Sequence, residues 1–250
     1  MKSLIFASRN IKEILRDPIS WIFCVGFPLV MLLIMNVVNS SIPAQAGMKL
    51  FEIQNLAPGI AMFGLTFVML FACLLVSGDR TDAFLLRVFT SPMKPAEYIL
   101  GYILPLIVLA AGQSLITGIV SAVMASVQGE SISVINMILS IFISIPSIIM
   151  YVSFGLLFGT LVNKNAAPGI CSIIISFSGM LGGIWMDVDA IGGTLGKICG
   201  ALPFLHSVKA ARFAYAGEFA EAFPETGIIA VWAIVVTVLA IMLFRKKMKY

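Results

Sequence analysis

Charge is scarce in this sequence. Charged residues make up 11% of its 250 residues, whereas hydrophobic residues make up 60%. Soluble domains carry about 25% charged residues, so the composition excludes an ordinary soluble protein. The net charge of +4 also gives no support to a strongly acidic, disordered or nucleic-acid-coating protein. We therefore expect a protein that lies in a lipid bilayer and binds no nucleic acid.

Six apolar stretches lack Asp, Glu, Lys and Arg altogether. A bilayer core of roughly 30 Å requires about 20 helical residues, so the stretches predict an all-α integral membrane protein with six transmembrane helices. Several prolines within or beside them predict kinks. The predicted spans are Ile19–Val38, Leu56–Ser77, Tyr98–Val127, Val134–Val162, Ala166–Met186 and Gly227–Phe244.

The residues of catalytic and metal sites are also few. The chain has one histidine, His206, and its four cysteines have no paired or ligand-like spacing. Asp187 and Asp189 lack further ligands for a metal site. The segment 192–198 resembles a phosphate loop but lacks the first glycine and the final Ser or Thr. We therefore expect no enzyme, metal or bound cofactor on this chain, and any ATP must bind to another chain.

Ionisable residues inside membrane spans mark proton relays and ion-coupled transport. Their absence from the six predicted spans disfavours a pump that a proton or metal gradient drives. Neutral polar groups remain as candidates for a transport pathway, although such groups most often hydrogen-bond a neighbouring helix. The candidates are Asn36, Gln113, Ser114, Thr117 and Ser153.

Lysine and arginine are distributed unevenly between the two sides of the predicted membrane protein. One side carries the N-terminal segment, the second and fourth loops and the C-terminal tail, with twelve of these residues, and the other side carries four: Lys49, Lys197, Lys209 and Arg212. The positive-inside rule predicts a multi-pass protein of the inner (plasma) membrane with both termini cytoplasmic. The basic start and Ala44-Gln45-Ala46 imitate a cleaved secretory signal, but the apolar run between them is too long.

Residues 1–17 alternate between apolar and charged positions at helical spacing. Leu4, Ala7, Ile11, Ile14 and Leu15 share one face of the predicted helix. The other face carries Arg9, Lys12, Glu13 and Arg16. This pattern predicts an interfacial amphipathic helix on the cytoplasmic membrane surface, in contact with lipid.

The second loop carries a short predicted helix over residues 79–90, with Asp79 as its cap and Pro92 after its end. Four large apolar side chains lie on one side of this helix and form what we term the loop ridge: Phe84, Leu85, Val88 and Phe89. Arg80, Asp82 and Arg87 flank the ridge. An exposed apolar ridge in a loop indicates contact with a partner protein or with lipid, and both alternatives are open at this point.

The order of these segments resembles the permease subunits of type 2 ABC exporters over nearly the whole chain. Residues 9–18 look like the connecting helix of that family. The segment from Asp79-Arg80 through Leu86-Arg87, Ser91-Pro92 and Gly101 looks like its coupling helix. Leu202-Pro203-Phe204, His206, Ala210-Ala211-Arg212 and Gly217 resemble its outer segment, here 187–225, which is re-entrant in the family. Gly78-Asp79 and Thr81-Asp82-Ala83 depart from the family pattern and leave the subfamily, and so the substrate, open.

The resemblance implies a single permease domain over residues 1–250 that works as a homodimer or as a heterodimer with a paralogous permease. A cytoplasmic ATPase subunit would bind ATP and Mg²⁺ and drive alternating access through the coupling and connecting helices. The expected activity is export of an amphiphilic substrate such as a drug, an antibiotic peptide or a lipid-like molecule. Two alternatives are a sodium exporter of the same family and a non-transporting scaffold or immunity-type protein.

Overall fold

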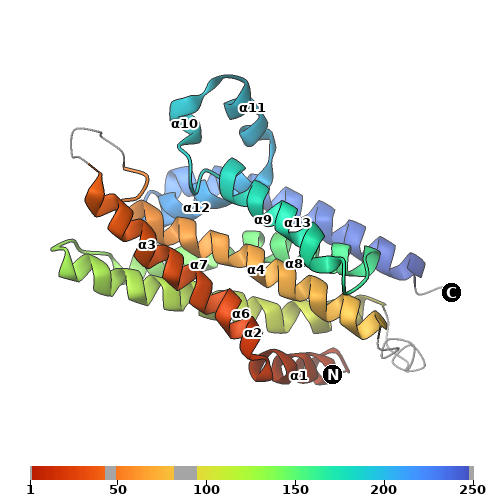
Figure 1. Ribbon diagram of the computed structural model, residues 1–250. Coiled ribbons are helices and arrows are strands. Elements are labelled where there is room, and N and C mark those ends of the chain that lie inside the picture. The colour runs from red at the N-terminus through yellow and green to blue at the C-terminus, as the bar shows by residue number, and fades with distance from the viewer. Residues whose placement is uncertain (1, 43–48, 82–94, 248–250) are drawn as a thin grey trace.

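A computed structural model describes residues 2–42, 49–81 and 95–247 of the chain (Figure 1). The described residues form helices joined by short turns, and no strand occurs among them, as expected for an all-α protein. The first part comprises α1 (Lys2–Arg16), α2 (Pro18–Trp21), the π-helical turn η1 (Ile22–Gly26), α3 (Phe27–Ser41), α4 (Ile53–Thr81) and α6 (Pro95–Val127). The second part comprises α7 (Val134–Ile143), α8 (Ile145–Leu161), α9 (Ala167–Leu181), α10 (Val188–Ile191), α11 (Gly193–Ala201), α12 (Pro203–Ala216) and α13 (Phe219–Lys247).

Helix α4 forms the centre of the bundle and is buried along most of its length. It packs against α3, α6, α8, α9 and α12, so it has almost no face left for lipid. Such all-round burial requires a helix that is apolar on every side, and the sequence of α4 fulfils this requirement up to its last turn. The two termini lie toward the same end of the bundle, at the right of Figure 1.

Four helical segments among the described residues are long and apolar enough to cross a membrane: 18–41, 53–81, 97–127 and 219–247. A fifth candidate is the pair α7 and α8, which bends by 44° at Ser144. Pro146 follows this bend and cannot donate to the carbonyl of Phe142, so the break lies where the sequence places a proline. The long fourth span is thus broken, in agreement with the predicted kinks.

The predicted span Ala166–Met186 is realised as the 15-residue helix α9. At a rise of 1.5 Å per residue, α9 measures about 22 Å, less than the roughly 30 Å of a bilayer core. Gly182 and Gly183 end the helix, and Gly183 adopts a positive φ of 72° that side-chain-bearing residues rarely adopt. The described helices therefore give four or five spans by length, and the count of six stays a prediction.

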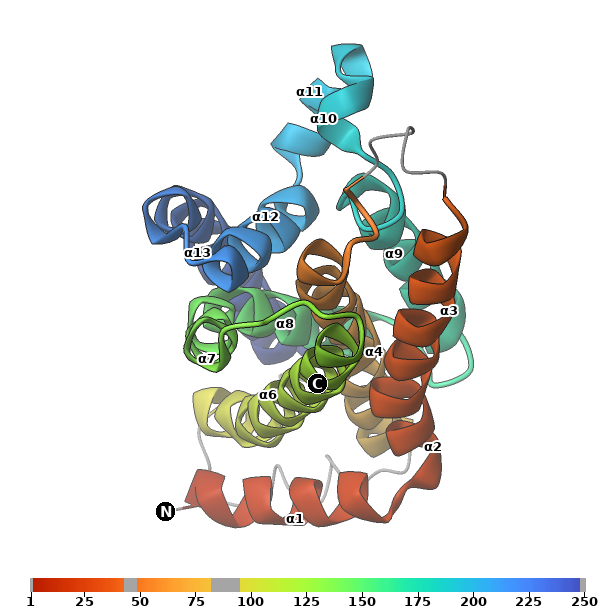
Figure 2. The same ribbon diagram turned by 90° about the vertical axis from the view of Figure 1, so that its left-hand side faces the viewer.

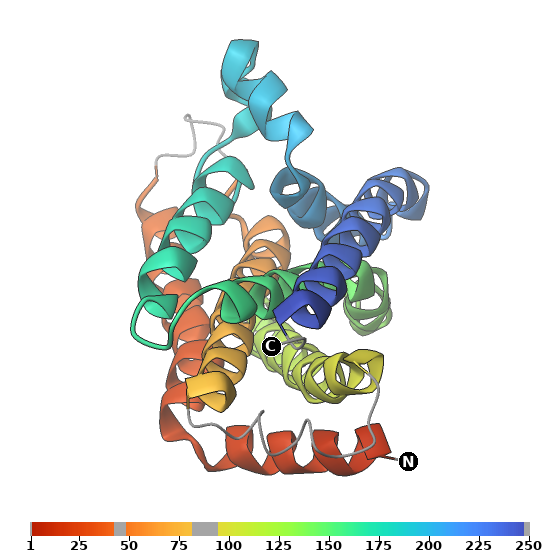
Figure 3. The ribbon, with the colours of Figure 1, turned by 90° about the vertical axis from the view of Figure 1, so that its right-hand side faces the viewer.

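The segment 187–225 folds into the short helices α10 and α11, then α12 and the first turns of α13. Figures 2 and 3 show α10 and α11 projecting from the bundle on the side opposite α1, while α12 lies within it. Serine side chains hold α12 against the broken pair α7 and α8. Ser140 donates to the carbonyl of Ala211 at 3.2 Å, and Ser207 donates to Ser147 at 2.8 Å.

Candidate functional site

Helix α1 lies across the bundle and packs mainly on α6, as Figures 2 and 3 show. Its contact with α6 centres on Phe6, which is 7% exposed. The ring of Phe6 makes edge contacts with the rings of Tyr98 and Tyr102, at centroid distances of 5.9 and 4.9 Å. Gly101 lies under Phe6, and a Cβ at this position would collide with the ring. Gly101 therefore allows α1 to approach the backbone of α6 closely.

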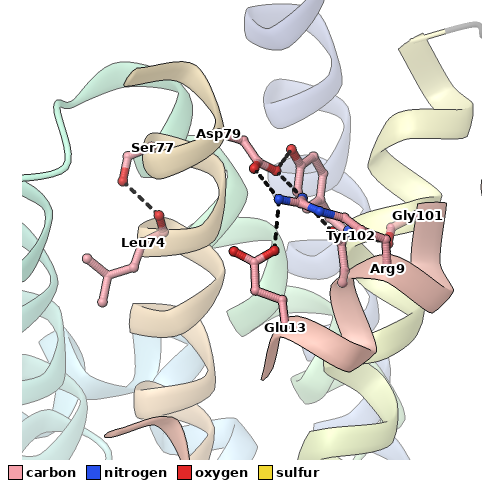
Figure 4. Close-up of polar contacts among 8 residues, drawn as sticks. Arg9, Glu13, Leu74, Ser77, Asp79, Gly101 and Tyr102 are labelled. Carbon is pink, nitrogen blue, oxygen red and sulfur yellow. Dashed lines mark hydrogen bonds and ion pairs between the residues drawn. The ribbon is translucent and has the colours of Figure 1, made fainter. Parts of the chain in front are cut away.

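The carboxylate of Asp79 lies where α1, α4 and α6 meet (Figure 4). Arg9 of α1 donates to both of its oxygens, at 2.8 and 2.9 Å, and the hydroxyl of Tyr102 on α6 donates to it at 2.7 Å. Asp79 is 5% exposed, so water cannot stabilise its negative charge, and the hydrogen bonds from these donors take the place of hydration. We call this arrangement of Arg9, Asp79 and Tyr102 the three-helix junction.

Two further contacts orient Arg9 within the three-helix junction. Glu13, one turn along α1, forms an ion pair with Arg9 at 2.8 Å. Asn10 accepts from Arg9 at 2.9 Å and donates to the carbonyl of Gly101 at 3.0 Å. Burial lowers the pKa of Arg9, but the hydrogen bond and charge of Asp79, with the charge of Glu13, more than compensate and raise it above its ordinary value. The bidentate geometry of a guanidinium on a carboxylate fixes the angle of α1 as well as its position.

Arg80, the next residue along α4, connects this end of the bundle to α8. One of its guanidinium nitrogens donates to the carbonyls of Gly159, Thr160 and Val162 at the C-terminal end of α8. A cation at a helix C-terminus satisfies carbonyls that have no partner within the helix. Adjacent residues of α4 therefore bind two different neighbours, α1 through Asp79 and α8 through Arg80.

The structure corrects one part of the predicted coupling helix. Residues 79–81 continue α4, and the carboxylate of Asp79 binds Arg9 and Tyr102, so its predicted role as the cap of a new helix is wrong. The remaining members of that prediction, Asp82, Phe84, Leu85, Arg87, Val88 and Phe89, lie outside the described residues. The described residues show that the chain enters this segment directly from the three-helix junction and leaves it into α6.

The predicted charged face of the connecting helix divides into two parts. Arg9 belongs to the three-helix junction and Glu13 forms an ion pair with it, while Lys12 and Arg16 are exposed. Leu4, Ile5 and Leu15 are exposed as well, between 55% and 72%. An amphipathic helix that leaves large apolar side chains uncovered beside basic ones is typical of a helix at a membrane surface.

The predicted pathway groups do not form one cluster. Gln113 donates to Thr117 within α6, Ser153 of α8 shares a hydrogen bond with Thr237 of α13, and Asn36 accepts from Gln128 near the far end of the bundle. Gln113 and Ser114 line two separate cavities. Among the described residues, the carbonyl oxygen of the Gln113 side chain and the hydroxyl of Ser114 are buried with no hydrogen-bond partner. These five residues therefore do not form a continuous polar pathway within one chain.

Sequence analysis did not predict the role of Tyr102, a member of the three-helix junction, or of Asn10, which orients Arg9 there. Tyr102 lies in an apolar run, where an aromatic residue gives no signal of a polar role. A signal did exist for Asp79, because a carboxylate at the very edge of a span requires a partner when it is buried. Arg9 was recognised as charged, but its register relative to α4 depends on the packing of Phe6 on Gly101.

The imidazole of His206 joins the helices of the outer segment. Its Nδ1 contacts Glu225 of α13, and its Nε2 lies 2.9 Å from the carbonyl of Gly200 at the end of α11. The Leu202-Pro203-Phe204 motif before it begins α12, where Pro203 occupies the first turn. His206 therefore acts as a structural link among α11, α12 and α13.

Long apolar helices around a buried central helix, with an amphipathic helix attached at one end, define a multi-pass membrane protein. Residues 3–215 match the family model of the ABC-2 type transporter, and the chain therefore belongs to that family. No curated protein matches the chain significantly. Members of this family are normally the non-catalytic membrane subunits of their transporters. The family match confirms the resemblance that the order of segments in the sequence indicated.

Proposed function

We propose that this chain is the permease subunit of an ATP-driven ABC exporter and that a separate cytoplasmic ATPase docks on the segment 82–94. The observation that carries the proposal, beyond family membership, is the three-helix junction. It joins α1 to the two helices that flank this segment, through hydrogen bonds from Arg9 and Tyr102 to Asp79. A force on the segment would therefore reach α1, α4 and α6 together.

In this mechanism, ATP binding closes the ATPases and displaces the loop ridge. Arg9 and Arg80 then transmit the displacement to α1 and α8, and the permease exchanges an inward-facing for an outward-facing arrangement. Such an exchange is driven only by contacts that differ in free energy between the two states. The proposed assembly contains two permeases, as a homodimer or with a paralogous chain, and α9 completes a sixth span with the residues that follow it. The proposed cargo is an amphiphile, a drug, an antibiotic peptide or a lipid-like molecule.

The orientation that this function requires can be tested by labelling single cysteines in intact cells. We expect a membrane-impermeant maleimide to label cysteines placed at Lys49 and Lys197 and to leave one at Lys247 unlabelled, because positively charged flanks stay cytoplasmic. The four native cysteines are buried in the structure, so background labelling is low. Labelling at Lys247 together with protection at Lys197 would contradict the proposed orientation.

Docking of the ATPase can be tested by replacing Phe84 and Phe89 with Ala. Anchors in an interface are each worth about 2 kcal/mol or more, so the double variant should retain less than a tenth of the ATPase that co-purifies with the natural chain. The matched control is Phe142→Ala with Phe177→Ala, which removes two exposed aromatic rings from other parts of the chain.

The two variants should keep the same unfolding temperature and the same surface expression. Equal ATPase recovery from both would show that the loop ridge contacts lipid rather than an ATPase. Transport itself is read out in vesicles that hold the permease with its ATPase and a fluorescent amphiphilic dye. ATP-dependent dye export that persists after ionophores collapse all ion gradients supports an exporter, and a bound dye without turnover supports a scaffold.

A further inference from the structure

A cavity of about 280 Å³ lies between the start of α4, the turn before α10 and the last turns of α12. It is at the end of α4 and α13 that faces away from the three-helix junction and the C-terminus. Pockets for drug-sized ligands measure about 300–1,000 Å³, so this cavity suits a small chemical group. Its polar lining consists of Asn55, Asp187, Asp189, Lys209, Arg212 and Glu218.

Arg212 is the unusual member of this lining. Its Nε donates to the carbonyl of Asn55 at 3.1 Å, but its Nη2 is buried and has no hydrogen-bond partner among the described residues. Gly59 of α4 makes room for the guanidinium, because a Cβ there would lie 3.3 Å from Nη2. Burial lowers the pKa of Arg212 to about 10, although the charges of Asp187 and Asp189 oppose this effect. A buried guanidinium with an unused donor has an unmet need for an oxyanion.

The neighbouring carboxylates do not meet that need. Asp187 accepts from the backbone nitrogens of Asp189 and Ala190 at the start of α10, at 3.1 and 3.0 Å. Asp189 forms an ion pair with Lys209 at 2.8 Å. Both acids thus lower the electrostatic cost of the buried cation from a distance, and neither accepts a hydrogen bond from its guanidinium.

The charges of the lining select among oxyanions. Three carboxylates and two cations line the cavity, so its side chains carry a small excess of negative charge. A free anion would gain Arg212 and meet three carboxylates, whereas a ligand with its own cation would also gain the carboxylates. The apolar part of the lining, which includes Leu205, Val188 and Phe213, suits the start of an acyl chain. The cavity lies at one end of α4, a candidate membrane span, and the end of a helix that just spans the hydrocarbon core lies beside the headgroups.

We propose that this cavity binds the zwitterionic headgroup of a phospholipid of the phosphatidylethanolamine type. The phosphodiester accepts from Arg212, and the ammonium group faces Asp187 and Glu218. The site is independent of the proposed ATPase contact, because it lies at the opposite end of α4. It would fix the outer segment to the lipid surface.

The proposal is tested with the full chain, purified in detergent and freed of lipid. The probe is dihexanoyl phosphatidylethanolamine, and saturable binding is read from the shift in the unfolding temperature. Dihexanoyl phosphatidylglycerol, inorganic phosphate and dihexanoylglycerol are titrated in parallel. We expect the ethanolamine lipid to bind at least fivefold more tightly than the other three, because all three lack the ammonium group and dihexanoylglycerol lacks the phosphate as well.

Arg212→Gln should weaken binding of the ethanolamine lipid at least tenfold. Lys197→Gln is the matched control, since Lys197 is an exposed cation of the same outer segment that does not line the cavity. Arg212→Lys keeps the charge without the planar fork and should give an intermediate loss. Asp187→Asn retains a side chain that caps α10 and should reduce the preference for ethanolamine over glycerol headgroups.

The Asp187→Asn comparison remains informative if Arg212→Gln does not fold. No saturable binding of the ethanolamine lipid to the natural chain would overturn the proposal. Equal binding of phosphatidylglycerol or phosphate would overturn the zwitterionic assignment in favour of a plain anion site. Equal losses from Arg212→Gln and Lys197→Gln would show that general surface charge attracts the lipid.

Discussion

Replacing Asp79 with Ala is expected to abolish ATP-driven export and to detach α1 from the bundle. The substitution leaves Arg9 and Tyr102 without their shared acceptor in a site where Asp79 itself is 5% exposed. Breaking a fully buried ion pair costs about 3–5 kcal/mol. The side chain of Arg9 is 36% exposed, and solvent can rehydrate it, so we expect a loss of about 1–3 kcal/mol in the free energy of unfolding.

Four variants separate the ion pair from the rest of the three-helix junction. Arg9→Gln and Asp79→Asn, measured singly and together, form a double-mutant cycle, and residues in direct contact show coupling of about 0.5–3 kcal/mol. Tyr102→Phe removes one donor but retains the ring that Phe6 contacts, so it should cost less than Asp79→Ala. Chemical unfolding in detergent gives the free energies, and limited proteolysis after Arg16 reports release of α1. Strictly additive free energies would falsify the coupling between α1 and α4.

These variants should reduce the rate of export by a larger factor than their small loss in free energy of unfolding would suggest. Asp79→Asn keeps the shape of the side chain and one acceptor oxygen, so the chain should fold and reach the membrane. The loss of the bidentate contact should nevertheless leave α1 free to lag behind α4 when the ATPase moves. A variant that folds, binds its ATPase and hydrolyses ATP without export is therefore the expected signature. Normal export by Asp79→Asn would show that the other contacts of α1, through Phe6 and Asn10 on α6, suffice to move it with the bundle.

The absence of charge located the long helices well, but it could not locate their ends. The second predicted span ends at Ser77, whereas α4 continues to Thr81 because Asp79 and Arg80 find partners on α1 and α8. The last helix begins at Phe219 rather than Gly227, since its first turns are amphiphilic and pack beside α12. Hydropathy detects apolar segments, and it does not detect the polar turns at their ends that stay helical because their side chains bind protein.

The face of α1 that contacts the bundle shows a second limit. The apolar period correctly marked Ala7 and Ile14, but Leu4 and Leu15 are exposed, and Asn10 is fully buried. Asn10 belongs to the buried face because it donates to the carbonyl of Gly101, and this carbonyl is free to accept because Pro105, four residues further along α6, has no N–H to donate to it. Such a register depends on a pair of residues about ninety positions apart, so it could not be read from a periodic pattern in one segment.

The glycines of α8 illustrate what a sequence pattern can and cannot predict. Gly155 and Gly159 are spaced as in a helix-packing motif, but this spacing also occurs by chance in a chain with 21 glycines. In the structure both face α4, which α8 contacts extensively. A Cβ on Gly155 would lie 2.5 Å from the Cβ of Ala72, and a Cβ on Gly159 would lie 2.7 Å from the carbonyl oxygen of Cys73. The spacing of the glycines indicated which residues could pack closely, but only the fold shows that their partner is α4.

Gly155→Ala and Gly159→Ala are therefore expected to be among the most damaging single-methyl changes in the chain. The obstacles are backbone and Cβ atoms of α4, which cannot rotate away as the end of a flexible side chain can. Overpacking of this kind costs about 1–3 kcal/mol per site, and the double variant should separate α8 from α4 along a full turn. Gly112→Ala and Gly227→Ala are matched controls, because a Cβ at either position meets nothing within 4 Å.

The controls should be neutral or should stabilise the protein by up to about 1 kcal/mol, since alanine favours the helix more than glycine does. Unfolding free energies measured in detergent decide the comparison, and equal losses at all four positions would mean that flexibility rather than close packing explains the glycines. Arg80 makes the outcome relevant to export, because it bonds to the carbonyls of Gly159, Thr160 and Val162 from the last turn of α4. When a new methyl at Gly159 pushes α8 outward, those carbonyls move away from Arg80, and a displacement of α4 no longer carries α8 and α13 with it.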